Sequence, residues 1–69
     1  MNRYLIIIEK AKGNFSAYSP DVPGCAATGS TRAEAEQEMR AAIRMHLEGM
    51  KEDGLPLPES TASVSYVEA

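Results

Sequence analysis

Cysteine and histidine are scarce in this 69-residue chain, which contains one of each, Cys25 and His46. A single cysteine cannot form an intrachain disulfide, which is typical of proteins from a reducing compartment. One cysteine and one histidine also fall short of the four ligands of a structural zinc site. The sequence therefore excludes a disulfide framework and a zinc-stabilised fold built within one chain.

Long apolar runs and dense basic charge are missing as well. The longest apolar run, Tyr4 to Ile8, is far shorter than the roughly 20 residues of a membrane-spanning helix, and no signal-peptide pattern opens the chain. We therefore expect a cytoplasmic protein. The formal net charge is −3, and no basic patch is dense enough for nucleic-acid phosphates, so direct DNA binding is not expected. This acidic balance favours a basic protein as the partner.

The composition that is present fits one small globular domain, residues 1–69. Hydrophobic residues make up 43% of the chain and charged residues 25%, as in ordinary globular proteins. A chain of this length buries a small core, so that self-association would add useful apolar burial. We therefore expect a homo-oligomer, most simply a homodimer.

The N-terminal third of the chain predicts a β-hairpin. Residues 3–9 are apolar on both faces and rich in β-branched side chains, which is typical of a central strand. Gly13 and Asn14 can supply the positive φ angles of a tight turn. Residues 15–19 alternate between the two faces and predict a second strand, antiparallel to the first.

The following segment turns the chain and leads into a short third strand. Pro20 ends the second strand, because proline has no backbone N–H to donate. Asp21 and the Pro23-Gly24 pair predict a turn, in which the Asp21 carboxylate accepts backbone hydrogen bonds. Residues 25–28 are small and compatible with a strand.

The middle of the chain predicts one helix over residues 32–53. Thr31 and Glu34 form a capping box at its start, with Ser30 as an alternative cap, and Gly54 ends it. Gly49 lies near the apolar stripe, and we expect it to allow close approach to a strand. The stripe itself consists of Ala35, Met39, Ala42, Ile43 and Met50, and it is expected to face the sheet while the charged opposite face is solvated.

The last alternating segment, residues 62–67, predicts a fourth strand at a sheet edge. A strand reached after a covering helix usually lies parallel to one already in the sheet. Pairing with residues 3–9 gives an α+β fold of the type β-β-β-α-β, with a four-stranded sheet in the order 3-2-1-4 and the helix on one face. The other face would remain uncovered and implies a partner surface.

Two pairs of reactive side chains suggest catalysis only weakly. Cys25 and His46 could form a nucleophile and its base, but no third orienting group is evident, and packing explains both residues more simply. Asp21 and Glu9 could be paired carboxylates, but a two-metal site needs several carboxylates that converge on the ions. We therefore expect a protein that is not an enzyme, with no catalytic, cofactor or metal site.

Several motifs at specific spacing resemble the HicB family of antitoxin-like proteins, over nearly the whole chain. In that family a strand, a Pro-Asp-x-Pro-Gly-Cys turn, a Gly-x-Thr segment before a helix rich in Glu and Ala, and a Gly-x-x-x-Pro exit follow one another. The matching residues here are Tyr4 to Ile8, Pro20-Asp21-Val22-Pro23-Gly24-Cys25, Gly29-Ser30-Thr31, Glu34-Ala35, and Gly54 to Pro58.

The resemblance implies a partial ribonuclease-H-like fold and the role of neutralising a small basic RNA-cleaving toxin of the HicA family by covering its surface. Full antitoxins of this kind usually add a C-terminal DNA-binding segment, and residues 1–69 contain none. An RNA-binding or hydrolytic domain that uses the same sheet is the alternative function. The candidate site residues are the turn motif Pro20, Asp21, Pro23, Gly24 and Cys25 and the helix ends Thr31, Glu34 and Gly54.

Overall fold

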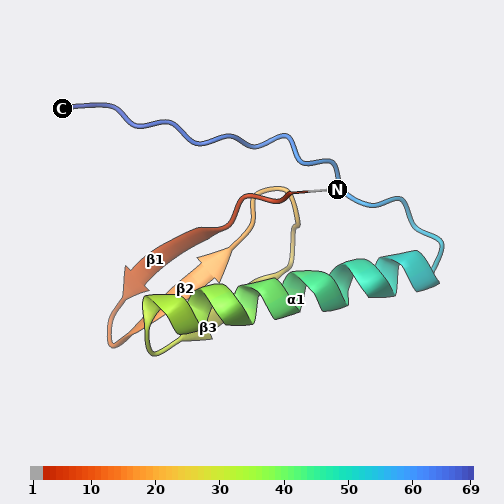
Figure 1. Ribbon diagram of the computed structural model, residues 1–69, viewed down its shortest axis with the longest axis horizontal. Coiled ribbons are helices and arrows are strands. Elements are labelled where there is room, and N and C mark those ends of the chain that lie inside the picture. The colour runs from red at the N-terminus through yellow and green to blue at the C-terminus, as the bar shows by residue number, and fades with distance from the viewer. Residues whose placement is uncertain (1–2) are drawn as a thin grey trace.

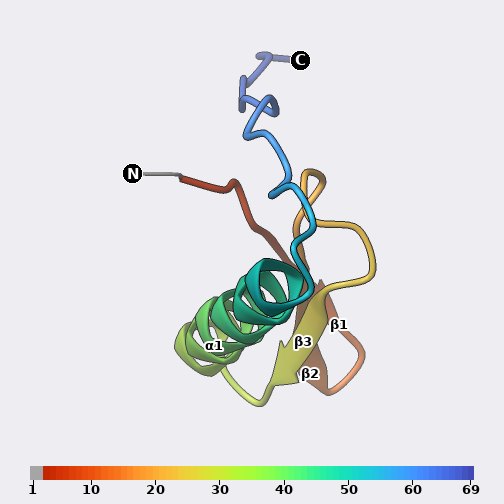
Figure 2. The same ribbon diagram turned by 90° about the vertical axis from the view of Figure 1, so that its right-hand side faces the viewer.

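A computed structural model describes residues 3–69 as one antiparallel sheet packed against one helix. β1 (Ile7–Ala11), β2 (Asn14–Tyr18) and β3 (Ala26–Gly29) form the sheet in the order β1-β2-β3, and α1 (Arg32–Glu52) follows. α1 lies on one face of the sheet and packs mainly against β3 (Figures 1 and 2). The predicted α+β class is confirmed. Across the described residues, no helix has the length and hydrophobicity needed to cross a membrane.

The hairpin between β1 and β2 is tighter than the sequence predicts. Ala11 pairs with Asn14, so the loop contains only Lys12 and Gly13. Gly13 has a φ of +84°, whereas no residue other than glycine has a positive φ in the described chain. The prediction that Asn14 takes a positive φ is therefore wrong, because Asn14 already belongs to β2.

β1 begins four residues later than predicted because its partner strand ends. Ile7 pairs with Tyr18, the last residue of β2, so the residues before Ile7 have no strand opposite them. The chain beyond Tyr18 turns away at Pro20, which cannot donate to a ladder. In place of a ladder bond, the buried Ser19 hydroxyl donates to the carbonyl oxygen of Leu5 at 2.7 Å.

The small core lies between α1 and the inner face of the sheet. Its buried members are Ala17, Val22, Cys25, Met39 and Ile43, with Met39 and Val22 fully enclosed. The helix side of this core follows an i, i+4 series, which places successive side chains on one helix face. That series continues through the half-buried Leu47, and the adjacent His46 is exposed. The interpretation that packing accounts for His46 is therefore wrong, because this residue is exposed.

Close approach of helix and sheet occurs at Gly29, the last residue of β3. A Cβ atom there would lie 2.9 Å from Cα of Ala35 and would collide with the Ala35 backbone nitrogen. Gly49, by contrast, has no heavy atom within 4 Å of the equivalent position. The prediction that Gly49 permits close packing is wrong, and Gly29 has that role.

The predicted fourth strand is absent from the described chain. Residues 62–67 form no strand, so the sheet has three strands and the order 3-2-1-4 is wrong. Side-chain hydrogen bonds hold the segment just before them: Tyr4 donates to the Pro58 carbonyl at 2.7 Å, and Ser60 donates to the Arg3 carbonyl. These contacts fix the start of residues 55–69, which we call the tail, near the end of the sheet. Beyond these contacts the tail extends away from β1 (Figure 1). The three-stranded sheet does not support the implied ribonuclease-H-like fold.

Candidate interaction surface

The turn motif, residues 20–25, is anchored by a residue that the sequence reasoning did not select. Val22 is fully buried, its N–H donates to the Ser19 carbonyl, and its carbonyl accepts from the Cys25 N–H, both at 3.3 Å. Gly24 has a φ of +80°, which returns the chain toward β3. The signal for Val22 is its place as the one branched apolar side chain between two prolines. Its burial makes the turn part of the core.

Asp21 in this turn binds the C-terminal segment. Its carboxylate accepts hydrogen bonds from the Thr61 N–H at 3.1 Å, the Thr61 hydroxyl at 3.1 Å and the Ala62 N–H at 2.9 Å. The sequence predicts that Asp21 accepts backbone hydrogen bonds, but within its own turn. The donors instead lie about forty residues further along the chain, and local patterns carry no information about such a contact.

Cys25 and His46 both line a shallow hollow of about 380 Å³, whose wall also includes Gly24, Ala42 and the exposed Met45. Cys25 is 8% exposed, and burial raises the pKa of its thiol, which keeps it protonated. The two residues form no hydrogen bond with each other in the described chain. This arrangement lacks the activated thiolate and the oriented base that nucleophilic catalysis needs.

Carboxylates do not gather into a metal site in the described chain. Residues 3–69 contain no group of three or more His, Cys, Asp or Glu side chains placed to hold an ion. Asp21 is occupied by the tail, and Glu9 lies exposed in β1. The two carboxylates therefore have different environments and do not form a pair.

The helix ends position the turn and the tail. Thr31 is the N-cap of α1, and its hydroxyl accepts from the Glu34 N–H at 3.0 Å. The Glu34 carboxylate accepts a hydrogen bond of 2.9 Å from the N–H of Ser30, the residue before the N-cap. At the other end, Gly54 has a φ of +70° and the Leu55 N–H donates to the Met50 carbonyl at 2.9 Å. This left-handed turn directs the chain back toward the start of the sheet.

The sheet face opposite α1 carries a half-exposed apolar patch, which we call the outer face: Ile7, Tyr18 and Ala26. Ile7 pairs with Tyr18, and Tyr18 pairs with Ala26, so the three side chains are cross-strand neighbours. Their strand neighbours Ile8 and Ala17 belong to the core, and alternation therefore directs the patch away from α1. Tyr18 is 42% exposed. No element of the described chain covers this face (Figure 2), as expected for a partner surface.

A three-stranded sheet with one helix on one face and an apolar patch on the other defines a small α+β domain. Residues 4–69 match the family described as HicB-like antitoxin of bacterial toxin–antitoxin system. The chain belongs to this family, which confirms the resemblance seen in the sequence. The family description is that of an antitoxin, which supports the prediction that the protein is not an enzyme.

Two relatives and one solved structure are similar to this chain. An uncharacterised 14.9 kDa protein from the rep–hol intergenic region of Haemophilus phage HP1 is 42% identical over 64 residues, which cover 93% of this chain and 48% of that protein. This chain thus spans about half the length of the phage protein. A UPF0150 protein of Thermoplasma acidophilum is 32% identical over 68 residues, covering 97% of this chain and 99% of that one.

The similar structure is a chain of a complex described as the HicA3 and HicB3 toxin–antitoxin complex. It superposes with a TM-score of 0.72 at 33% sequence identity and covers 87% of this chain and 70% of that chain. The family and this neighbour together support an antitoxin role.

Proposed function

We propose that this protein binds a small basic HicA-like RNA-cleaving toxin and neutralises it by covering its surface. The observation that carries the proposal is the similarity, in fold and in sequence, to a chain of a toxin–antitoxin complex. The protein would act in the cytoplasm, where RNA is the toxin's substrate, and as a homodimer. Its single domain, residues 1–69, would be sufficient for toxin binding.

The outer face of the sheet is our candidate for the toxin-binding surface. A half-exposed tyrosine beside small and branched apolar side chains offers the aromatic anchor that binding interfaces favour. Glu9 follows Ile7 in β1 by two residues and therefore lies on the same face, where its exposed carboxylate can attract a basic partner. The turn motif supports this face from one end, because Val22 and Cys25 fix the loop between β2 and β3 in the core.

Co-expression with a basic toxin-sized protein encoded beside this chain tests the proposal. We expect the wild-type chain to co-purify with the toxin and to restore growth. Tyr18→Arg should reduce toxin binding by at least about tenfold, since a buried charge without a partner is costly at an interface. Met45→Arg is the matched control, because Met45 is also an exposed apolar residue, on α1 and away from the outer face.

The outcomes separate the site from the function. Failure of the wild-type chain to bind the toxin or to restore growth would contradict the antitoxin proposal. Equal loss in both arginine variants, or loss in Met45→Arg alone, would move the binding site off the outer face while leaving the function in place. Metal-dependent cleavage of RNA by the purified chain would favour the hydrolytic alternative.

A further inference from the structure

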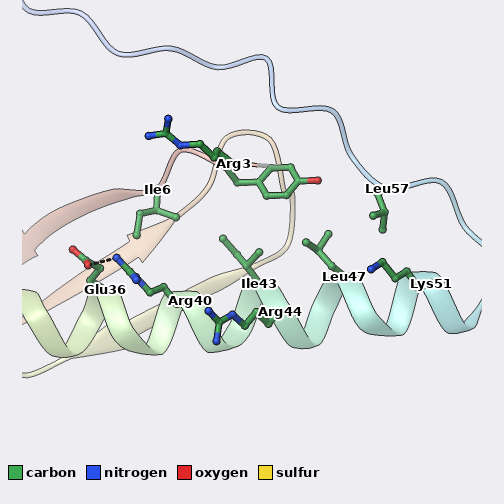
Figure 3. A pocket seen from close by; sticks show the side chains of 10 residues that line it. Arg3, Ile6, Glu36, Arg40, Ile43, Arg44, Leu47, Lys51 and Leu57 are labelled. Atoms are coloured by element: carbon green, nitrogen blue, oxygen red, sulfur yellow. Dashed lines mark hydrogen bonds and ion pairs between the residues drawn. The ribbon is translucent and has the colours of Figure 1, made fainter. Parts of the chain in front are cut away.

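A groove lies between α1 and the segment that leads into β1, on the inner side of the molecule. It has a volume of about 670 Å³, and Ile6, Ile43 and Leu47 form its apolar floor. Figure 3 shows Ile6 from the N-terminal segment opposite Ile43 and Leu47 from the helix. Ile6 and Leu47 are partly buried residues packed against the core. The groove is therefore a continuation of the hydrophobic core that reaches the surface.

Basic side chains border this groove. Arg3, Arg40, Arg44 and Lys51 all line it. Arg40 is paired with Glu36 at 2.9 Å, whereas Arg3, Arg44 and Lys51 form no ion pair with any described residue. An occupant suited to this groove would combine apolar side chains for the floor with a carboxylate for the rim.

The groove also adjoins an open sheet edge. Within residues 3–69, β1 pairs with β2 on one side only, so its other side presents backbone groups that no described strand pairs. An added strand would satisfy these groups, as in recognition by β-strand addition. The preferred occupant is therefore an extended segment.

Residues 62–68 of this chain have all of these properties. In extended geometry Ala62, Val64, Tyr66 and Glu68 lie on one face, which gives two large apolar side chains followed by a carboxylate. Val64 is 63% exposed and Tyr66 is 91% exposed. Residues 63–69 form no hydrogen bond to any described residue. Beyond Ala62, the segment is thus an exposed apolar stretch with no hydrogen-bond partner among the described residues.

The contacts of residues 60–62, where the tail begins to leave the domain, indicate that its partner is another copy of the chain. Thr61 and Ala62 are held by the Asp21 carboxylate, and Ser60 is held by the Arg3 carbonyl. From these contacts, which we call the Asp21 clamp, the tail runs away from α1 and β1 (Figures 1 and 2). We propose that residues 62–68 of one copy add as a strand to the β1 edge of a second copy, with Val64 and Tyr66 on the groove floor and Glu68 at the basic rim.

Exchange of tails between two copies is reciprocal. The same tail and the same groove are used by both protomers, which gives a closed twofold dimer. Each copy gains the fourth strand that its own tail does not supply. The exchange covers the inner groove and leaves the outer face of each sheet free, so it does not depend on toxin binding.

Disulfide capture between two different variants tests the exchange. In a Cys25→Ala background, one chain carries Leu47→Cys and the other carries Tyr66→Cys. We expect a covalent dimer when the two are mixed under oxidising conditions and essentially none from either variant alone. Placing both cysteines on one chain should give mainly intermolecular products. A product that is only an intrachain disulfide would overturn the proposal, because it would place the tail in its own groove, and absence of any cross-link would overturn it as well.

Light scattering at micromolar concentration provides an independent measurement. The wild-type chain should have the mass of a dimer, and Val64→Asp, which places a charge toward the groove floor, should have the mass of a monomer with an unchanged circular dichroism spectrum. Ser65→Asp is the matched control, since it adds the same charge to the opposite face of the tail and should remain a dimer. A monomeric wild-type protein, or equal behaviour of the two variants, would contradict the exchange.

Discussion

Asp21 and Thr61 are joined by two hydrogen bonds, from the Thr61 N–H and from its hydroxyl, each 3.1 Å long. With the third bond, from the Ala62 N–H, they connect the turn after β2 to the tail after α1. Carboxylates accept such bonds strongly because they carry a full charge. The turn motif thus organises both the core, through Val22, and the path of the tail, through Asp21.

Removing this carboxylate should release the tail. In Asp21→Ala we expect hydrogen exchange at the Thr61 and Ala62 amides to accelerate by about tenfold, since both lose their acceptor. Exchange in α1 should be unaffected. Glu59→Gln is the control, because this nearby exposed carboxylate forms no hydrogen bond with described residues. Unchanged amide exchange in Asp21→Ala would show that the clamp is not formed in solution.

Adding a methyl group at Gly29 should disrupt the contact between β3 and α1. Gly29→Ala forces a Cβ atom against the Ala35 backbone, and neither element can shift without disturbing the core, so we expect a loss of about 1–3 kcal/mol in unfolding free energy. Chemical denaturation measures this loss. Ala26→Val, at an exposed position of the same strand, serves as the control and should change stability little. Equal stability of Gly29→Ala and wild type would refute the close approach.

The two glycines at the end of α1 should respond in opposite directions. Gly54→Ala should destabilise by about 1 kcal/mol, because alanine is strained at a positive φ even where its side chain has space. Gly49→Ala should stabilise by about 0.5–1 kcal/mol, because it replaces glycine within a helix at an uncrowded position. Thermal unfolding of the two variants and the wild type measures both changes in stability. Shifts in the same direction would contradict the helix end assigned here.

The buried thiol should make stability depend on alkaline pH. Burial raises the pKa of Cys25 above its ordinary value of 9.0, so the folded state retains the proton that the unfolded chain releases. This contribution is fully present below the unfolded pKa and is lost as the pH rises from there through the folded pKa. We expect the wild-type unfolding free energy to fall more than that of Cys25→Ala as the pH rises above 9.0. Parallel pH profiles would mean that the thiol is accessible to water.

The amino-acid sequence determined the local elements of this protein. The start of α1 depends on Thr31 and Glu34, three residues apart, and its end depends on Gly54, because these groups act on backbone atoms within one helical turn. The hairpin follows from Gly13 and the alternation of β2 in the same way. The family motif could also be read directly, since it consists of residue types at fixed spacing.

Only the tertiary structure decided which distant segments meet. The alternation of residues 62–67 fits a strand, but a strand forms only where an edge is within reach, and the Asp21 clamp directs this segment elsewhere. His46 and Leu47 are neighbours in the helix, yet the angle at which α1 crosses the sheet leaves one exposed and buries part of the other. The enclosure of Val22 likewise depends on packing between residues far apart in the chain. The close approach at Gly29 depends on how α1 folds back over the end of β3, which residue types alone do not encode.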